Sequence, residues 1–173
     1  MFMTELTHSK IFSQIRELLH SAKERIISEV NTQMVYTYFE IGKIIVEYKQ
    51  EGREKAKYGQ STLKDLSEKL TSEFGTGFSI RNLEYMRKFY ICYSKSQTVS
   101  AKFSLSWSHY VALIKLDDLS RKFYEIEATK NHWGVREMER QIMSQLFERL
   151  AISKNDKEIQ LLSQEGQIIE RPE

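Results

Sequence analysis

The sequence of 173 residues contains one proline, seven glycines and one cysteine. Because proline and glycine are the residues that most often interrupt helices, their scarcity predicts a mainly α-helical protein. The single cysteine, Cys92, excludes an internal disulfide and is typical of a protein from a reducing cytoplasm. No apolar run approaches the ~18 residues of a membrane span, and no basic segment leads into an apolar signal core. We therefore expect a cytoplasmic location and no membrane partner.

Neither sign of charge is in large excess, since the net charge is only +2. The distribution of charge along the chain is more informative. Residues 1–75 contain 11 basic and 11 acidic side chains, residues 76–150 contain 12 and 8, and residues 151–173 contain 3 and 5. A basic surplus in the middle of the chain favours contact with phosphate groups, as in nucleic acid. A solvated face with a few additional lysines explains the same surplus equally well.

Apolar residues recur at helical spacing from Ser9 to about Glu51, and this pattern predicts two long amphipathic helices. We place a break or bend near Asn31, after which the period resumes through Met34 and Tyr48. Two such helices are expected to pack antiparallel on each other or on a second copy of the chain. Residues 1–58 are therefore predicted to form a packing and dimerisation unit, and a homodimer is expected.

The region 59–151 is predicted to contain two helix-turn-helix units, at 61–93 and at 118–151. In the first unit, Gly75 occupies a position that requires a left-handed backbone, and Ser79 is placed to cap the next helix. A serine-rich stretch at 94–106 is predicted as an irregular loop or as a short β-hairpin, which would make the region winged-helix-like.

Two further helices are predicted around the second unit. A short one begins at Trp107, and the next is capped by Asp117 or Asp118. A turn at 132–134 then precedes a helix from Val135 to about Ile152. Residues 152–173 are predicted to form a short helix and a linker.

The helix that follows Ser79 carries the main candidate site. At 100° per residue, Leu83, Met86 and Tyr90 share one side, and the opposite side is basic and aromatic. A helix that reads nucleic acid needs long donors that reach base edges or phosphates. Four residues on or beside this outer side are the leading DNA-binding candidates: Arg81, Asn82, Tyr85 and Lys88. The simpler explanation is an ordinary amphipathic helix pair inside a bundle.

Three arginines are candidates for additional phosphate contacts: Arg87, Arg136 and Arg140. The last two belong to the stretch NHWGVREMERQ, in which Trp133 is expected to anchor a turn before Gly134. Acidic neighbours at helical spacing could pair with these arginines instead.

The sequence gives little support for catalysis by this chain. Its four histidines and Cys92 lack the spacing of metal ligands, and no phosphate-binding loop occurs. Its Glu-x-Lys trio, residues 47–49, lies inside a predicted helix and precedes the first aspartate, Asp65, so it does not form a carboxylate nuclease site. His109 is expected to be a hydrogen-bonded residue at a packed helix start. We therefore expect no enzyme activity, metal or cofactor for this chain.

Several stretches, in order along the chain, resemble the N-terminal domain of the YhcG family: NTQMVYTYFEIGKIIVE, AKYG, LSEKLTSEFGTGFSIRNLEYMRKFY, LSWSHYVALIKL, RKFYEIEATKNHWGVREMERQI and ERLAISK. The resemblance implies a bacterial, mostly helical module that binds DNA and directs an attached nuclease domain of the PD-(D/E)xK type. The sequence ends about where that nuclease domain would begin, so no nuclease residue is transferred to this chain.

The resulting prediction is a DNA-binding module that positions a nuclease domain supplied in cis or in trans, with duplex DNA as its partner. The alternative is a module for protein interaction and dimerisation that makes no direct contact with nucleic acid.

Overall fold

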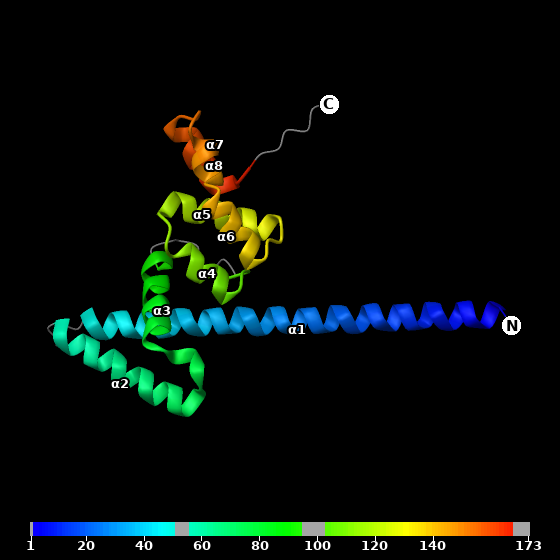
Figure 1. The fold of residues 1–173 in the computed structure, drawn as a ribbon, viewed down its shortest axis with the longest axis horizontal. Coiled ribbons are helices and arrows are strands. Elements are labelled where there is room, and N and C mark those ends of the chain that lie inside the picture. Colours follow the sequence, from blue (N-terminus) through cyan, green and yellow to red (C-terminus); the bar gives the residue numbers. More distant parts are fainter. Residues whose placement is uncertain (1, 51–55, 95–102, 168–173) are drawn as a thin grey trace.

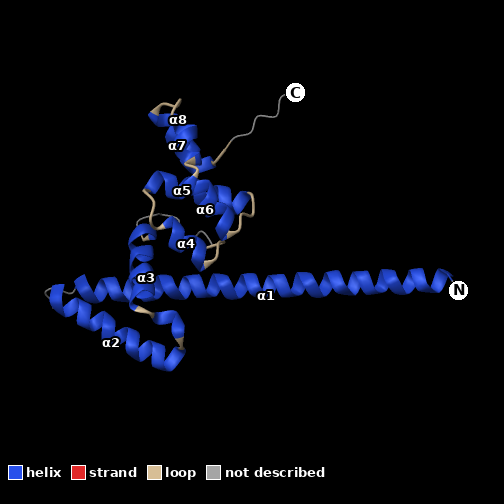
Figure 2. Ribbon diagram, in the orientation of Figure 1, coloured by secondary structure: helices blue, strands red, loops and turns tan. Residues whose placement is uncertain are grey.

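In the computed structural model the described residues are 2–50, 56–94 and 103–167, and side chains are described for 10–48, 63–94 and 103–167. All of the regular secondary structure in the described part is helical (Figures 1 and 2). Its elements are, in order, α1 Phe2–Gln50, α2 Ala56–Phe74, the 3₁₀ turn η1 Thr76–Phe78, α3 Ile80–Tyr93, α4 Trp107–Leu113, α5 Asp118–Lys130, α6 Val135–Met143, α7 Leu146–Ala151 and α8 Asp156–Glu165.

The prediction of two helices separated near Asn31 is wrong, because α1 is one helix of 49 residues. At 1.5 Å per residue it is about 74 Å long. No proline or glycine occurs between Phe2 and Ile41, so nothing in this stretch stops helix propagation. Only the second half of α1 contacts the rest of the fold, and the first half extends away from it (Figure 1).

The second half of α1 packs against α3, which crosses it steeply (Figure 1). Gly42 makes this crossing possible. A Cβ atom at this position would overlap the carbonyl oxygen of Met86 and lie 2.7 Å from its carbonyl carbon. The two backbones therefore approach more closely than any larger residue allows.

An aromatic core fills the space between α1, α3 and α4. Phe89 lies at its centre, with ring centroids 4.9 Å from Tyr110, 5.1 Å from Phe103 and 5.4 Å from Trp107. Phe89 is completely buried, although the helical period alone would place it beside the outer side of α3. Its ring packs against α4.

The predicted β-hairpin finds no support, since none of the described residues is in a strand (Figure 2). Most of its expected residues, 95–102, lie outside the described part of the chain. Phe103 and Leu105, which the hairpin pattern predicts on one face, are both buried in the aromatic core.

Helix α2 starts at Ala56, before the start of the helix-turn-helix unit predicted at 61–93. The turn that follows α2 agrees with the prediction, because Gly75 has a φ of +91°.

Helices α5 to α8 form the part of the fold farthest from α1 (Figure 1). The cap predicted for α5 is confirmed, since the carboxylate of Asp117 accepts hydrogen bonds from the Leu119 and Ser120 backbone N–H groups. The single helix predicted from Val135 to Ile152 is instead α6 and α7. They are separated at Gln145, whose φ of +54° is left-handed. No glycine or proline marks this break in the sequence.

Candidate nucleic-acid interface

The turn between α2 and α3 is held by hydrogen bonds at both ends. The Ser67 hydroxyl donates to the Phe78 carbonyl at 2.8 Å, which ties the turn to α2. The Ser79 hydroxyl accepts from the Asn82 backbone N–H at 3.3 Å, as predicted for an N-cap. These bonds fix the direction in which α3 leaves the turn.

Asn82 stabilises the same turn with its side chain. Its Nδ2 donates to the Gly77 carbonyl at 2.5 Å, and its Oδ1 accepts from Trp107 Nε1 at 2.9 Å. The amide therefore connects the turn to α4. Both polar ends are already engaged within the chain, which assigns Asn82 a positioning role that its place in the sequence does not indicate.

Arg81 is exposed and is oriented by Tyr85 one helical turn later. Its Nε donates to the Tyr85 hydroxyl at 2.8 Å, and its guanidinium lies 5.6 Å from the centroid of the Tyr85 ring. Tyr85 itself is half-buried against the aromatic core. The contact restricts the Arg81 side chain while its two Nη groups carry four further donors.

Lys88 is exposed on the same side of α3, about 20° from Arg81 at 100° per residue. Glu84 is also exposed nearby and offsets part of the charge. Over its whole length α3 contains three basic residues and one acidic residue. The outer side predicted from the sequence is therefore exposed and basic, as a surface for a polyanion requires.

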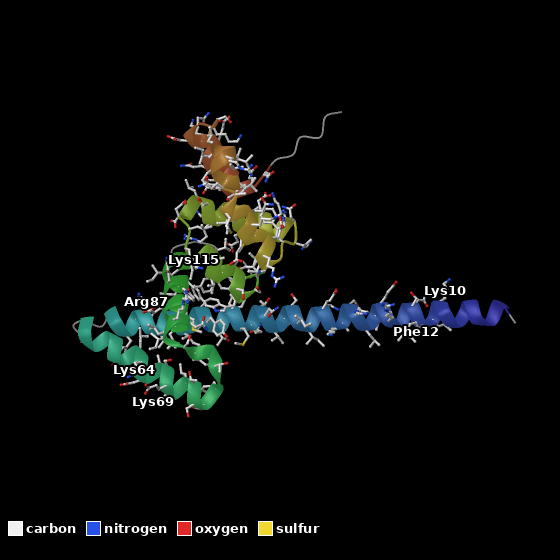
Figure 3. The ribbon with its side chains drawn as sticks, viewed as in Figure 1. Lys10, Phe12, Lys64, Lys69, Arg87 and Lys115 are labelled. Carbon is white, nitrogen blue, oxygen red and sulfur yellow. The ribbon has the colours of Figure 1, made fainter. Side chains whose placement is uncertain are left out.

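Arg87 lies on α3 close to where this helix crosses α1 (Figure 3). It is half-buried, and its Nε is enclosed without a hydrogen-bond partner among the described residues. Its position makes it a weaker candidate for contact with a ligand outside the chain.

The second basic pair lies on α6 and is separated from the first. Arg136 and Arg140 are both exposed, but Arg140 donates two hydrogen bonds to the Glu137 carboxylate, at 2.7 and 3.0 Å. This bidentate pairing raises the pKa of the Arg140 guanidinium and partly neutralises its charge. Helices α3 and α6 each pack against α4, so α4 lies between the helices that carry the two basic sets (Figure 1).

His109 is buried, and both of its ring nitrogens form hydrogen bonds within the fold, in agreement with the prediction. Its Nε2 lies 3.0 Å from the Trp133 carbonyl, and its Nδ1 lies 2.7 Å from the Ser106 hydroxyl. Since a carbonyl only accepts, Nε2 carries the proton and Nδ1 accepts from Ser106. This arrangement joins the start of α4 to the turn before α6, with Trp133 half-buried as an anchor.

A half-buried carboxylate, Glu125, lies between two tyrosines. It accepts from the Tyr93 hydroxyl at 2.9 Å and from the Tyr110 hydroxyl at 3.3 Å. Burial raises its pKa, although these hydrogen bonds and the nearby Arg121 oppose the shift. Both acceptor bonds of the carboxylate are used within the fold, where they join α5 to α3 and α4.

Within the described ranges, no group of three or more histidine, cysteine, aspartate or glutamate side chains is arranged to hold a metal ion. A search of the same residues finds no helix with the length and apolar character needed to cross a membrane. The fold and the candidate site therefore define a helical module with an exposed basic helix.

Comparison with known proteins identifies the family. Residues 14–149 match the family described as DUF1016 N-terminal domain, and the chain belongs to this family. It is 34% identical over 181 residues to the protein named "Putative nuclease YhcG" of Escherichia coli (strain K12), an alignment that covers 87% of this chain. The aligned part is 48% of that protein, so the chain spans about half the length of this relative. No solved structure matches the chain.

The family predicted from the sequence motifs is therefore confirmed.

Proposed function

We propose that this chain is a DNA-binding module that positions a nuclease region on its substrate. The observation that carries the proposal is the outer side of α3, where Arg81 and Lys88 are exposed while the opposite side is buried against α1. The relative's name includes a nuclease, and a nuclease needs a surface that holds nucleic acid in place. That relative is about twice as long as the part aligned here, and we place the nuclease chemistry in its remaining half.

Arg81 and Lys88 are proposed to contact phosphate groups. A guanidinium and an ammonium about two turns apart on one side of a helix can both engage phosphates of a strand. The first turn of α3 adds the positive end of the helix dipole. Tyr85 and Asn82 act as positioning residues, since the first orients Arg81 and the second fixes the turn.

Arg87, Arg136 and Arg140 are proposed as secondary contacts. Arg136 has the most accessible position of the three, because Arg87 is half-buried and Arg140 is paired with Glu137. A duplex that reached both α3 and α6 would have to pass across α4.

The test is fluorescence anisotropy with labelled duplex DNA, single-stranded DNA and RNA at two salt concentrations. We expect binding to the duplex, with log K falling against log salt by about 0.9 for each phosphate contact. The double variant Arg81→Ala/Lys88→Ala should weaken binding about tenfold to 100-fold and reduce that slope by roughly two.

The matched control is Lys64→Ala/Lys69→Ala. It removes the same charge from exposed positions of α2 and should change affinity far less (Figure 3). Equal losses in both double variants would indicate general electrostatic attraction. Unchanged duplex affinity in the α3 variant at low salt would contradict the proposal.

An interaction module remains the second candidate function, and one observation favours it. The first half of α1 exposes a row of apolar side chains that this chain does not cover. Since this surface and α3 are separate, one molecule can use both.

A further inference from the structure

The first half of α1 carries a continuous apolar stripe on its surface. The exposed fraction of its members ranges from 39% to 67%. We call these residues the α1 stripe: Ile11, Phe12, Ile15, Leu18, Leu19, Ile26, Ile27, Val30 and Met34. A row of this kind on a helix in water indicates an interaction site, because an apolar helix face is normally covered by packing.

The α1 stripe faces away from the side of the helix that builds the core. At 100° per residue, Ile15 and Ile26 lie roughly opposite to the buried Val35 and Phe39. Figure 3 shows Phe12 on the lower side of α1 and close to its N-terminal end, whereas α2 and the other helices gather around the opposite end of α1. The folded body of the same chain is therefore not placed to cover this surface.

The positions of the stripe are symmetric along the helix. The steps from Ile11 to Val30 are 4, 4, 3, 4 and 4 residues, through Ile15, Leu19, Ala22 and Ile26. The spacing of these apolar positions is the same in both directions about a point between His20 and Ser21. An antiparallel second copy centred there would place Ile11 opposite Val30, Ile15 opposite Ile26, and Leu19 opposite Ala22.

This register also matches side-chain sizes. The large Leu19 faces the small Ala22 twice across the symmetry axis, so the middle of the contact is evenly filled. A parallel pair would place Ala22 against Ala22 and leave a narrow gap at that level. The antiparallel arrangement is therefore the better-packed one.

The surface available is the right size for a stable pair. With roughly 100 Å² of apolar area for each side chain, about half of it still exposed, two stripes would bury on the order of 1,000 Å² of apolar surface. Interfaces are about 60% apolar, which corresponds to a total near the standard size of roughly 1,600 Å².

The charges beside the stripe do not favour a lipid surface as the occupant. Residues 10–34 contain four basic side chains and three acidic ones. An amphipathic helix that lies on anionic membranes has a strongly basic polar face. Near-neutral flanks suit a protein surface better.

We propose that residues 11–30 of α1 pair antiparallel with the same residues of a second copy of this chain. The pair has a two-fold axis between His20 and Ser21, and it is independent of the DNA contact proposed for α3.

The first test is sedimentation equilibrium of the whole chain and of Ile15→Glu/Ile26→Glu. We expect the unsubstituted chain to be a dimer and the variant to dissociate about 100-fold more readily, because each dimer would bury four carboxylates. The matched control is Ser13→Glu/Ser28→Glu, which adds the same charge on the opposite side of α1. It should remain dimeric.

These substitutions lie outside the core, so folding can be checked separately. Ile15 and Ile26 are 54% and 65% exposed, and circular dichroism should show a helical, cooperatively unfolding variant. An unsubstituted chain that remains monomeric, or equal dissociation of variant and control, would overturn the proposal.

The second test determines the direction of pairing. In a Cys92→Ser background, proteins carrying Ile15→Cys and Ile26→Cys are mixed and treated with a thiol cross-linker spanning less than ~10 Å. In the antiparallel pair, two copies of the same position are 11 residues apart, or about 16 Å, so only the mixed product should form. Cross-linking of each variant to itself alone would overturn the antiparallel register.

Discussion

Residues 10–34 and residues 35–48 of α1 belong to one helix but differ in what covers their apolar side chains. In the second segment, Val35, Phe39 and Ile45 are each at most 6% exposed and pack against other helices of the chain. In the first segment, side chains of the same kind are mostly half or more exposed. The difference shows that the second segment builds the fold, whereas the first is available for a partner.

The two apolar surfaces are centred on roughly opposite sides of the helix, since Val35 and Phe39 point away from Ile15 and Ile26, although Ile45 points in the same direction as Ile27 at 100° per residue. This change of side occurs near residue 34 without any interruption of the backbone. One rigid helix can thus hold a folded body at one end and an association surface at the other. We expect the substitutions below to have progressively smaller effects on stability.

Gly42→Ala should destabilise the chain more than any other single methyl addition discussed here. The new Cβ would meet the backbone of Met86, which cannot rotate away as a side chain can. We expect a loss of about 3 kcal/mol or more in the free energy of unfolding, measured by urea denaturation. Gly134→Ala is the control, because its Cβ would meet nothing within 4 Å, and it should cost less than about 1 kcal/mol.

Val35→Ala and Val30→Ala compare the two segments directly with the same substitution. Val35 is 0% exposed and Val30 is 55% exposed. In dilute monomer, Val35→Ala should lower the free energy of unfolding by about 2 kcal/mol, and Val30→Ala should leave it almost unchanged. Thermal unfolding monitored by circular dichroism measures both. Equal losses at low concentration would show that residues 10–34 pack within the monomer.

The smallest effect is expected from Glu125→Gln. Burial raises the pKa of Glu125 in the folded state above its unfolded value. The folded protein therefore holds this proton more tightly, and the associated stability is present at low pH and lost as pH rises through the folded pKa. We expect Glu125→Gln to reduce the fall in stability that begins as pH rises above the ordinary glutamate pKa of about 4.5, in urea titrations of both proteins. A pH dependence unchanged by the substitution would contradict this assignment.

The sequence predicts the helical class and several local signals correctly. Ser79 and Asp117 are found as caps, and Gly75 has the positive φ that its position requires. These features depend on short-range chemistry that a few neighbouring residues specify. The family motifs extend the prediction to most of the chain.

The predictions that fail depend on longer-range packing. The predicted break near Asn31 is wrong because the apolar surface shifts around the axis of one continuous helix. The helical period through Met34 and Tyr48 follows two exposed residues and misses the buried Val35 and Phe39. The sequence does not indicate the break at Gln145, because a glutamine and not a glycine adopts the left-handed conformation there.

The candidate site is predicted in part. The exposure of Arg81 and Lys88 follows from the helical period alone. The role of Asn82 does not, because its partner Trp107 is 25 residues away in sequence. Likewise, the pairing of Arg140 with Glu137 is possible from spacing, but only the structure shows that it forms.

Hydrogen exchange along α1, measured over a range of protein concentration, tests the contrast between its two segments most directly. We predict that amides of residues 11–30 become more protected as concentration rises, while those of residues 35–48 stay equally protected throughout. Protection of residues 11–30 that does not depend on concentration would contradict the account, since it would mean that no second copy covers them.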